Sequence, residues 1–403
     1  MEFKRYGIKD RPNKAFVRQF TPPGGAPERK NGKNDDTFRS YQLDFFKFIL
    51  AIYVFISHTQ CFVGENTRIK LPANIGGDSV HVFFIISGML MANSIYKHYS
   101  DQYISQPGKG AMTFLMSKVK SMLPQSMAAL LISFSVLSIC VYKDLNAILY
   151  NLTTIFPEMF FINQAGMDIR FNPPMWYVSA MLICMLPMAY LLIKKSDFML
   201  YVCAPLSAVI SLGVMCMAND YGWSYIFVNV IINVHYEGLI RALAGLNFGI
   251  CAYTIYSKIC EDDKLPNVFY TFLEVVLYCL FFVVTLFFDN SLIARNVMSV
   301  LLTVPITVAI TFSGKSNVSK LFRFRWMRYF SPISFDIFLN HWAARVIVEN
   351  VFPAHSYKFS VMIMALLTIL FSMINHLIVK LCNLAVKNMF LKQLKRRALD
   401  ESL

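Results

Sequence analysis

Two ionisable side chains lie eleven positions apart in an apolar stretch near the start of the chain. The stretch QLDFFKFILAIYVFISHTQ, residues 42–60, holds Asp44, Lys47 and His58 among residues that suit a lipid bilayer. Eleven helical residues make about three turns, so Lys47 and His58 share one helix face and lie about 16 Å apart along its axis. A lysine attracts anions, and a histidine transfers protons near neutral pH. The spacing therefore predicts one site with an anion-binding end and a proton-transfer end.

A structural explanation of these residues is also open. Lys47 could extend its ammonium group to the lipid headgroups, and His58 could form a buried hydrogen bond. Ionisable residues inside membrane helices are costly and commonly functional, however, and a shared face favours a joint role. Asp44 precedes Lys47 by about one turn, and we expect it to orient that lysine. Ser57 is disfavoured as a nucleophile activated by His58, because adjacent helical residues do not face each other.

The helices that must position these residues are predicted from hydropathy. Of the 403 residues, 56% are hydrophobic and 15% are charged, which is more apolar than a soluble domain. Ten runs of about 18 or more mainly apolar residues are predicted to span a membrane as helices. These runs cover residues 43–63, 79–97, 122–142, 176–193, 199–218, 239–257, 267–287, 294–313, 333–351 and 359–381. The expected fold is an all-α membrane protein with about ten transmembrane helices around a central cavity.

The basic residues are concentrated in alternate loops between these predicted helices. If the N-terminus is cytoplasmic, most of the 38 lysine and arginine residues fall on the inner side, as the positive-inside rule requires. We therefore expect both termini in the cytoplasm. We interpret the net charge of +14 as a sign of orientation in the lipid bilayer, and not of nucleic-acid binding.

Three regions follow from composition. Residues 1–41 are predicted to be a disordered basic cytoplasmic tail, residues 42–383 the ten-helix membrane domain, and residues 384–403 a second basic cytoplasmic tail. The nine cysteines show no CxxC pairing, so the sequence supports neither a metal site nor a disulfide framework. The sequence gives no indication of the oligomeric state.

A second polar stripe lies in the ninth predicted helix. His341, Arg345 and Glu349 fall at i, i+4 and i+8 and so share one helix face. Arg345 and Glu349 are expected to pair, which lowers the cost of burying them. His341 lies near the middle of the membrane, where it could support His58 or contact an acceptor.

Other polar residues lie at the ends of predicted helices. Arg241 follows Glu237 by four residues, so the spacing favours an interfacial ion pair. His81 begins the second predicted helix, where it could contact an acceptor or simply be hydrated. Ser87 and Gly88 in that helix favour close helix packing.

The first predicted helix also carries a family resemblance. Leu43-Asp44-x-x-Lys47, followed by His58, resembles the start of the acyltransferase family 3 membrane enzymes, which have LD-x-x-R and then a histidine at that spacing. Lys47 departs from this pattern, because it keeps the charge but loses the planar fork that binds phosphate in a bidentate manner.

Three later segments, in chain order, are similar to further motifs of that family. SVHVFFIISGML (79–90) is similar to FF-x-x-SG, NPPMWYVSAML (172–182) to PLW-x-x-S, and SFDIFLNHWAA (334–344) to S-Y-x-x-Y-L-x-H-W. Many members have a glutamate after the tryptophan where this chain has Ala180-Met181, so no acidic partner is carried over there.

The resemblance implies an integral-membrane O-acyltransferase. It implies transfer of an acyl group, acetyl in the first instance, from cytosolic acyl-CoA to a hydroxyl of a glycan or lipid-linked saccharide acceptor on the outer side. Acetyl-CoA would be a co-substrate, with no tightly bound cofactor. We expect the protein in a bacterial cytoplasmic (inner) membrane, where it would modify polysaccharides.

Roles for single residues follow from the motif matches and from the helix faces. The proposed roles are catalysis for His58, as general base, and His341; acyl-CoA binding for Lys47, Lys118, Lys120 and Arg241; acceptor binding for Trp176, Arg345 and His81; and structural support for Asp44, Ser87 and Gly88. Direct transfer and transfer through an acyl-histidine intermediate are both open.

A transporter or an acyl carrier without transfer chemistry is the alternative function. Charged groups along a helix face would also suit a translocation path. Many transporters contain repeated halves, and the sequence shows no internal repeat, which favours the enzyme.

The orientation can be tested directly. Reporter fusions at Gly108 and Lys195 should report the cytoplasmic side, and a fusion at Ser356 should report the outer side, because the basic loops lie inside. An outer position for Lys195 would contradict the predicted boundaries and require a different number of helices.

Overall fold

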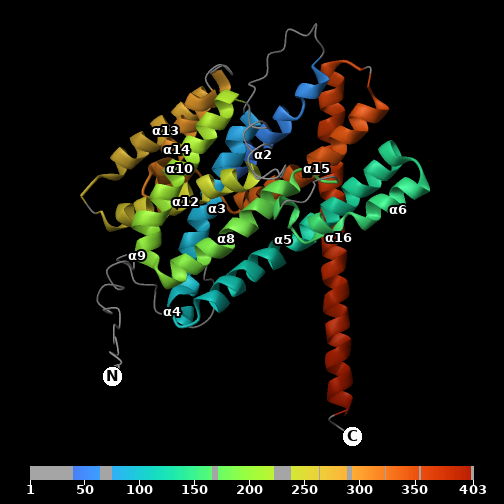
Figure 1. The fold of residues 1–403 in the computed structure, drawn as a ribbon, viewed down its shortest axis with the longest axis horizontal. Coiled ribbons are helices and arrows are strands. Elements are labelled where there is room, and N and C mark those ends of the chain that lie inside the picture. The colour runs from blue at the N-terminus through green and yellow to red at the C-terminus, as the bar shows by residue number, and fades with distance from the viewer. Residues whose placement is uncertain are drawn as a thin grey trace, which may run out of the picture.

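The computed structural model describes residues 40–63, 75–165, 171–221, 237–262, 264–287, 293–322, 324–353 and 355–400. Over these residues the protein is helical and contains no strand (Figure 1). The expected tail 1–41 lies outside the described residues except for Ser40 and Tyr41. The expected tail 384–403 continues the last helix as far as Asp400.

The helices differ widely in length, and a few are single turns at the ends of longer ones. The α-helices are α2 (Tyr41–Ser57), α3 (Ile75–His98), α4 (Ser100–Tyr103), α5 (Pro107–Leu137), α6 (Leu145–Thr153), α7 (Phe156–Met159), α8 (Met175–Lys194), α9 (Ser196–Phe198), α10 (Ala204–Tyr221), α12 (Glu237–Glu261), α13 (Asn267–Phe287), α14 (Ile293–Ser313), α15 (Phe330–Val351) and α16 (Tyr357–Asp400). Short 3-10 and π segments are η1 (Gln60–Phe62), η2 (Ser138–Tyr142), η3 (Asn163–Ala165), η4 (Met199–Cys203), η6 (Asn317–Phe322) and η7 (Arg325–Tyr329).

Each of the ten predicted membrane segments falls on a helix. Within the described residues, eight helices are long and apolar enough to cross a membrane: α2 with η1, α3, α5 with η2, α8, α10 with its preceding turns, α12, α13 and α16. Residues 300–313 of α14 form a shorter apolar helix. The polar residues of α15 make this helix less apolar than the eight candidate spans. The chain is an integral membrane protein with about eight spans, and which side each loop faces stays a prediction.

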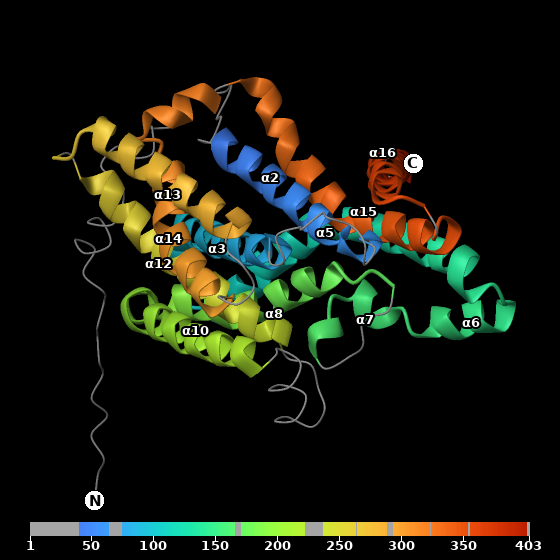
Figure 2. The same cartoon turned by 90° about the horizontal axis from the view of Figure 1, so that it is seen from above.

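The helices are arranged around α2 and α3. In both views α10, α12, α13 and α14 gather on one side of these two helices, and α6, α15 and α16 gather on the other (Figures 1 and 2). α3 is the most buried of the candidate spans and packs against α2, α8, α12 and α14. α16 extends beyond the rest of the bundle as one long helix (Figure 1).

Local sequence signals determine where α2 begins and keep it continuous. The side chain of Ser40 accepts a hydrogen bond from the backbone N–H of Leu43 at 3.3 Å, which caps the helix. Asp44 lies in the first turn, where a carboxylate is favoured by the helix dipole. The helix then continues without a break to Ser57, so Lys47 and His58 are held at a fixed spacing.

Glycines allow α3 and α12 to approach closely. A Cβ at Gly88 would overlap the backbone carbonyl of Leu246, and a Cβ at Gly249 would overlap the carbonyl of Ile85. The predicted packing role of Gly88 is therefore confirmed. Close approach of small residues is a common way for membrane helices to associate, because lipid provides no hydrophobic force between them.

The outer helices expose apolar side chains. Phe272 and Phe287 on α13, and Met373 and Leu377 on α16, are all more than half exposed. Apolar surfaces of this extent are not stable in water, and a bilayer would cover them. Helices α13 and α16 thus form part of the lipid-facing surface, whereas α3 is largely buried.

Replacement of Gly88 by alanine should destabilise the fold by about 1–3 kcal/mol, because the new methyl group has no room beside Leu246. Thermal unfolding of the purified protein in detergent measures the effect. Gly213→Ala is the matched control, since a Cβ there meets no atom within 4 Å and alanine favours helix. Equal stability of the two variants would contradict the packing role.

Candidate active site

Lys47 points into a cavity between α2, α3, α5, α8 and α15, which we call the Lys47 cavity. Its volume is about 440 Å³. The lining residues are Lys47, Phe83, Ile86, Ser87, Leu90, Lys118, Ser121, Met122, Gln125, Tyr177, Met181, Met185, Ser331, Pro332, Ser334, Phe335 and Phe338. Two ammonium groups, from Lys47 and Lys118, thus line one largely apolar space.

Asp44 holds Lys47 as the spacing predicted. The Lys47 ammonium group lies 3.2 Å from the Asp44 carboxylate, one turn away on the same helix. A paired lysine is less costly to bury, and it still has donors that can reach a ligand in the cavity.

Contrary to the predicted grouping, Lys120 does not line the Lys47 cavity beside Lys47 and Lys118, and its side chain is exposed. Lys118 and Lys120 are two residues apart on α5, a rotation of about 200°, so only one of them can face inward. Lys118 does so with its ammonium group 5.4 Å from the centre of the Phe114 ring.

His58 and His341 line a second cavity, which we call the histidine cavity. Its volume is about 520 Å³. The lining residues are Val54, Ser57, His58, Gln60, Cys61, Gly76, Gly77, Val80, Pro173, Pro174, Trp176, Arg241, Phe338, His341 and Arg345. Most of the polar residues that the sequence singled out at this end of the bundle therefore meet in one space.

The two histidines come from different helices and face each other. The centres of the His58 and His341 rings are 4.8 Å apart, with an angle of 30° between the rings. The Trp342 ring meets His58 edge-on at 5.8 Å. α15 packs along α2, and this contact brings the C-terminal end of α2 beside the middle of α15.

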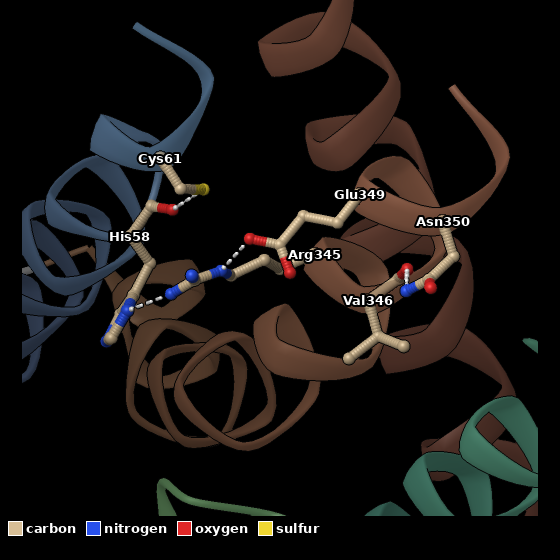
Figure 3. A network of polar contacts seen from close by, with 6 residues as sticks. All are labelled: His58, Cys61, Arg345, Val346, Glu349 and Asn350. Atoms are coloured by element: carbon tan, nitrogen blue, oxygen red, sulfur yellow. Dashed lines mark hydrogen bonds and ion pairs between the residues drawn. The ribbon is translucent and has the colours of Figure 1, made fainter. Parts of the chain in front are cut away.

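Arg345 links His58 to a carboxylate. Its Nη1 atom lies 3.4 Å from Nδ1 of His58, and its Nε atom donates to Glu349 at 2.8 Å (Figure 3). The predicted Arg345–Glu349 pair is confirmed, and it has a second role that the sequence did not predict. The same guanidinium group fixes the orientation of the His58 ring.

The hydrogen bonds define which ring nitrogens carry protons. Arg345 has only donors, so Nδ1 of His58 accepts and Nε2 of His58 carries the hydrogen. His341 shows the opposite arrangement, because its Nδ1 lies 3.2 Å from the backbone oxygen of Ile337 and must donate to it. Nε2 of His341 then has a free lone pair. This atom is buried and has no hydrogen-bond partner among the residues that the structure describes.

Arg241 lies in the histidine cavity and not with Lys47 and Lys118, contrary to the predicted acyl-CoA set. Its guanidinium group lies over the Trp176 ring at 5.3 Å and donates to the oxygen of Gly77 at 3.4 Å. It stands near the start of α12, and this end of α12 lies beside the start of α3. Because Lys47 lies three turns from that end of the bundle, Arg241 cannot share a cavity with it. The side chain of Glu237, its expected partner, lies outside the described residues.

His81 is buried and lines neither cavity, contrary to its predicted acceptor contact. Only 2% of its surface is exposed, and its Nε2 atom lies 3.5 Å from Nη2 of Arg241. α3 is packed on several sides, so a residue nearly two turns inside it is covered by protein instead of facing the membrane surface. His81 supports Arg241 from behind the cavity wall.

The predicted continuous cavity along α2 is divided into two. Phe338 lines both the Lys47 cavity and the histidine cavity, and it stands between them. Phe83 and Tyr177 pack against its ring at 6.0 and 5.5 Å. The prediction of one open path from Lys47 to His58 is therefore wrong for this conformation, because the packing of α15 inserts an aromatic ring that the sequence did not single out.

The comparison with protein families matched residues 40–376 to acyltransferase family 3, as its acyltransferase domain. The chain belongs to acyltransferase family 3. The matched region contains every residue that lines the two cavities. The searches among curated proteins and solved structures found no match. The protein is therefore a membrane acyltransferase.

Two residues of this family 3 acyltransferase that the motif analysis assigned to support have clear contacts. Ser87 and Tyr177 share a hydrogen bond at 3.0 Å beside the Lys47 cavity, and Gly88 makes the close α3–α12 contact described above. Ser57 donates to the oxygen of Val54 at 2.7 Å and not to His58, in agreement with the view that it is not an activated nucleophile.

The acyltransferase also uses a carboxylate that sequence reasoning missed. Glu158 is buried, and its two oxygens accept the backbone N–H groups of Phe171 and Asn172 at 2.8 and 2.9 Å. The Asn172 amide donates to the oxygen of Leu339 at 3.2 Å. These bonds hold the segment before α8, which brings Trp176 to the histidine cavity. A lone acidic residue in an otherwise apolar stretch between two predicted membrane helices is the signal that could have identified Glu158.

Proposed function

We propose that this acyltransferase transfers an acyl group, acetyl in the first instance, from cytosolic acyl-CoA to a hydroxyl of a glycan or lipid-linked saccharide on the outer side of a bacterial cytoplasmic membrane. The observation that carries the proposal is the His58–His341 pair, whose ring centres are 4.8 Å apart in one cavity. Paired histidines with different protonated nitrogens can accept a proton at one atom and donate at another, which acyl transfer requires.

The Lys47 cavity suits the phosphate end of acyl-CoA. Lys47 and Lys118 offer two cationic groups there, and charge-assisted hydrogen bonds to phosphate are strong. Acyl-CoA carries its thioester at the end of a long flexible arm. Since Lys47 and His58 lie about 16 Å apart on one helix face, an arm lying along α2 would bring the thioester toward the histidines.

The hydrogen bonds favour a division of roles that reverses the sequence-based assignment. Nε2 of His341 would take the proton from the acceptor hydroxyl as its oxygen attacks the thioester carbon. Nε2–H of His58 would donate to the carbonyl oxygen as negative charge develops there. The C–S bond then breaks, and the proton passes from His341 to the departing CoA thiolate. Arg345 would act by orienting His58.

The roles of the histidines predict different effects of glutamine substitutions. His341→Ala and His341→Gln should both lower acetyl transfer by about 10²–10⁴-fold, because neither replacement supplies a base. His58→Ala should lower it by about 10²–10³-fold, whereas His58→Gln should recover part of the loss, because glutamine keeps an N–H donor. Transfer of labelled acetyl groups from acetyl-CoA to envelope glycans by membranes containing the protein measures these effects.

The control for this series is His355→Ala, which removes an exposed histidine outside both cavities. Full activity of His341→Gln together with an inactive His58→Gln would show that His58, and not His341, is the general base. Absence of acetylated glycan with the wild-type protein, while acetyl groups still cross the membrane, would instead support an acyl carrier.

The lysines are predicted to affect donor binding. Lys47→Met and Lys118→Met should each raise the KM for acetyl-CoA by about ten-fold or more with a smaller effect on kcat, because each removes one charged hydrogen-bond donor. Lys47→Arg should be tolerated. Steady-state kinetics with varied acetyl-CoA measures both constants.

Lys120→Met is the matched control for the lysine series, since Lys120 is an exposed neighbour on the same helix. An unchanged KM in Lys47→Met, or the same increase in Lys120→Met, would contradict phosphate binding in the Lys47 cavity.

A further inference from the structure

Phe338 occupies the boundary between the two cavities. Among the residues that the structure describes, it alone lines both the Lys47 cavity and the histidine cavity. Its surface is only 5% exposed. It lies one turn before His341 on α15, and the centres of the two rings are 6.3 Å apart. A change in the position of this ring would therefore alter both cavities and the environment of His341.

Three aromatic rings from three helices form the barrier. Phe338 of α15 contacts Tyr177 of α8 at 5.5 Å and Phe83 of α3 at 6.0 Å, and Phe83 and Tyr177 are 6.1 Å apart. These distances are typical of edge-to-face aromatic pairs. The barrier is closed in this conformation.

The members of the barrier are not held equally. The Tyr177 hydroxyl is bound to Ser87 at 3.0 Å, and the Tyr177 ring also packs on Phe84 at 4.4 Å. Phe338 has no polar anchor, and an open space lies on each side of it. Phe83 has no polar group either, but it lines the Lys47 cavity alone. Because Phe338 has a cavity on each side, it is the ring with the most room to rotate.

We infer that Phe338 is a gate that the acyl group must pass and that its side chain limits the size of the acyl group. The inference rests on the proposed function, in which phosphates bind at Lys47 while the thioester reacts at the histidines. A thioester bound in this way has to cross the boundary that Phe338 closes. Because Phe338 also lines the histidine cavity beside His341, its ring borders the space in which the acyl group reacts and disfavours longer chains there.

The gate also keeps the reactive thioester from water on the donor side. While the acyl group lies beyond the boundary, the arm of acyl-CoA fills the opening that the displaced Phe338 ring leaves, so no wide path for water opens from the Lys47 cavity. A smaller side chain would leave a permanent opening, through which water could reach the thioester and hydrolyse it to the free acid and CoA thiol.

Substitutions of Phe338 test this inference with labelled acetyl-CoA and butyryl-CoA supplied to membranes that contain the protein. Phe338→Ala and Phe338→Leu should each raise the ratio of butyryl to acetyl transfer by about ten-fold or more, because a tight apolar site discriminates about ten-fold or more per methylene. Phe338→Ala should also release CoA thiol without an equivalent amount of acylated product. Phe338→Trp should lower transfer of both groups.

Phe335→Ala is the matched control. Phe335 lies on the same helix and lines the Lys47 cavity only. It should leave the ratio of butyryl to acetyl transfer unchanged. The folding of each variant is checked by its elution as a single species in detergent, and Phe338→Leu keeps the test valid if Phe338→Ala does not fold.

The outcomes separate the gate from the proposed function. An unchanged ratio in folded Phe338→Leu, or the same increase in Phe335→Ala, would overturn the gate while wild-type acetyl transfer still supported the enzyme. Absence of transfer from either donor by the wild-type protein would overturn the proposed function itself, and the gate with it.

Discussion

Burial of charge in an apolar bundle is the constraint on which the two cavities depend. An unpaired cation inside a membrane is costly, and two of the four lysine and arginine residues that line the cavities are paired with a carboxylate on their own helix. Lys47 lies 3.2 Å from Asp44, and Arg345 lies 2.8 Å from Glu349. Because both partners belong to one helix, each pair forms with its helix and does not need a second element. The remaining donors of each cation are then available to a cavity.

The second requirement is that α2 and α15 stay in register, because His58 and His341 belong to different helices. Contacts at both ends of α2 meet this requirement. The rings of Phe45 and Phe48 pack on Phe330, at 5.2 and 4.7 Å, near the start of α15. Thr59 and Tyr357 share a hydrogen bond at 3.1 Å at the opposite end, where α16 begins. The distance between the histidines thus depends on contacts that other residues near the two ends of α2 make.

The sequence predicted what is local and missed what depends on packing between helices. Hydropathy located the helices, and helical spacing predicted the Asp44–Lys47 and Arg345–Glu349 pairs, because both signals lie within one segment. The outward direction of Lys120 was also readable from that spacing. The burial of His81 and the separation of Arg241 from Lys47 could not be predicted from the sequence, because they depend on how α3 and α12 pack. Phe338 was missed for the same reason, since a phenylalanine in a membrane helix carries no signal of a boundary.

In the proposed mechanism, an aromatic boundary also reconciles the two demands that transfer across a membrane makes on one protein. The polar residues that bind and react must line a path, yet a path open at both ends would let water and ions cross the bilayer. Phe338, Phe83 and Tyr177 close the path with apolar rings, which offer water no hydrogen bonds. A flexible acyl-CoA arm is itself largely apolar at its reacting end, so it can replace the ring in the boundary as the ring moves aside. In this mechanism sealing and transfer use the same space at different times, and the position of Phe338 one turn before His341 would link the opening of the path to the place where the bond is exchanged.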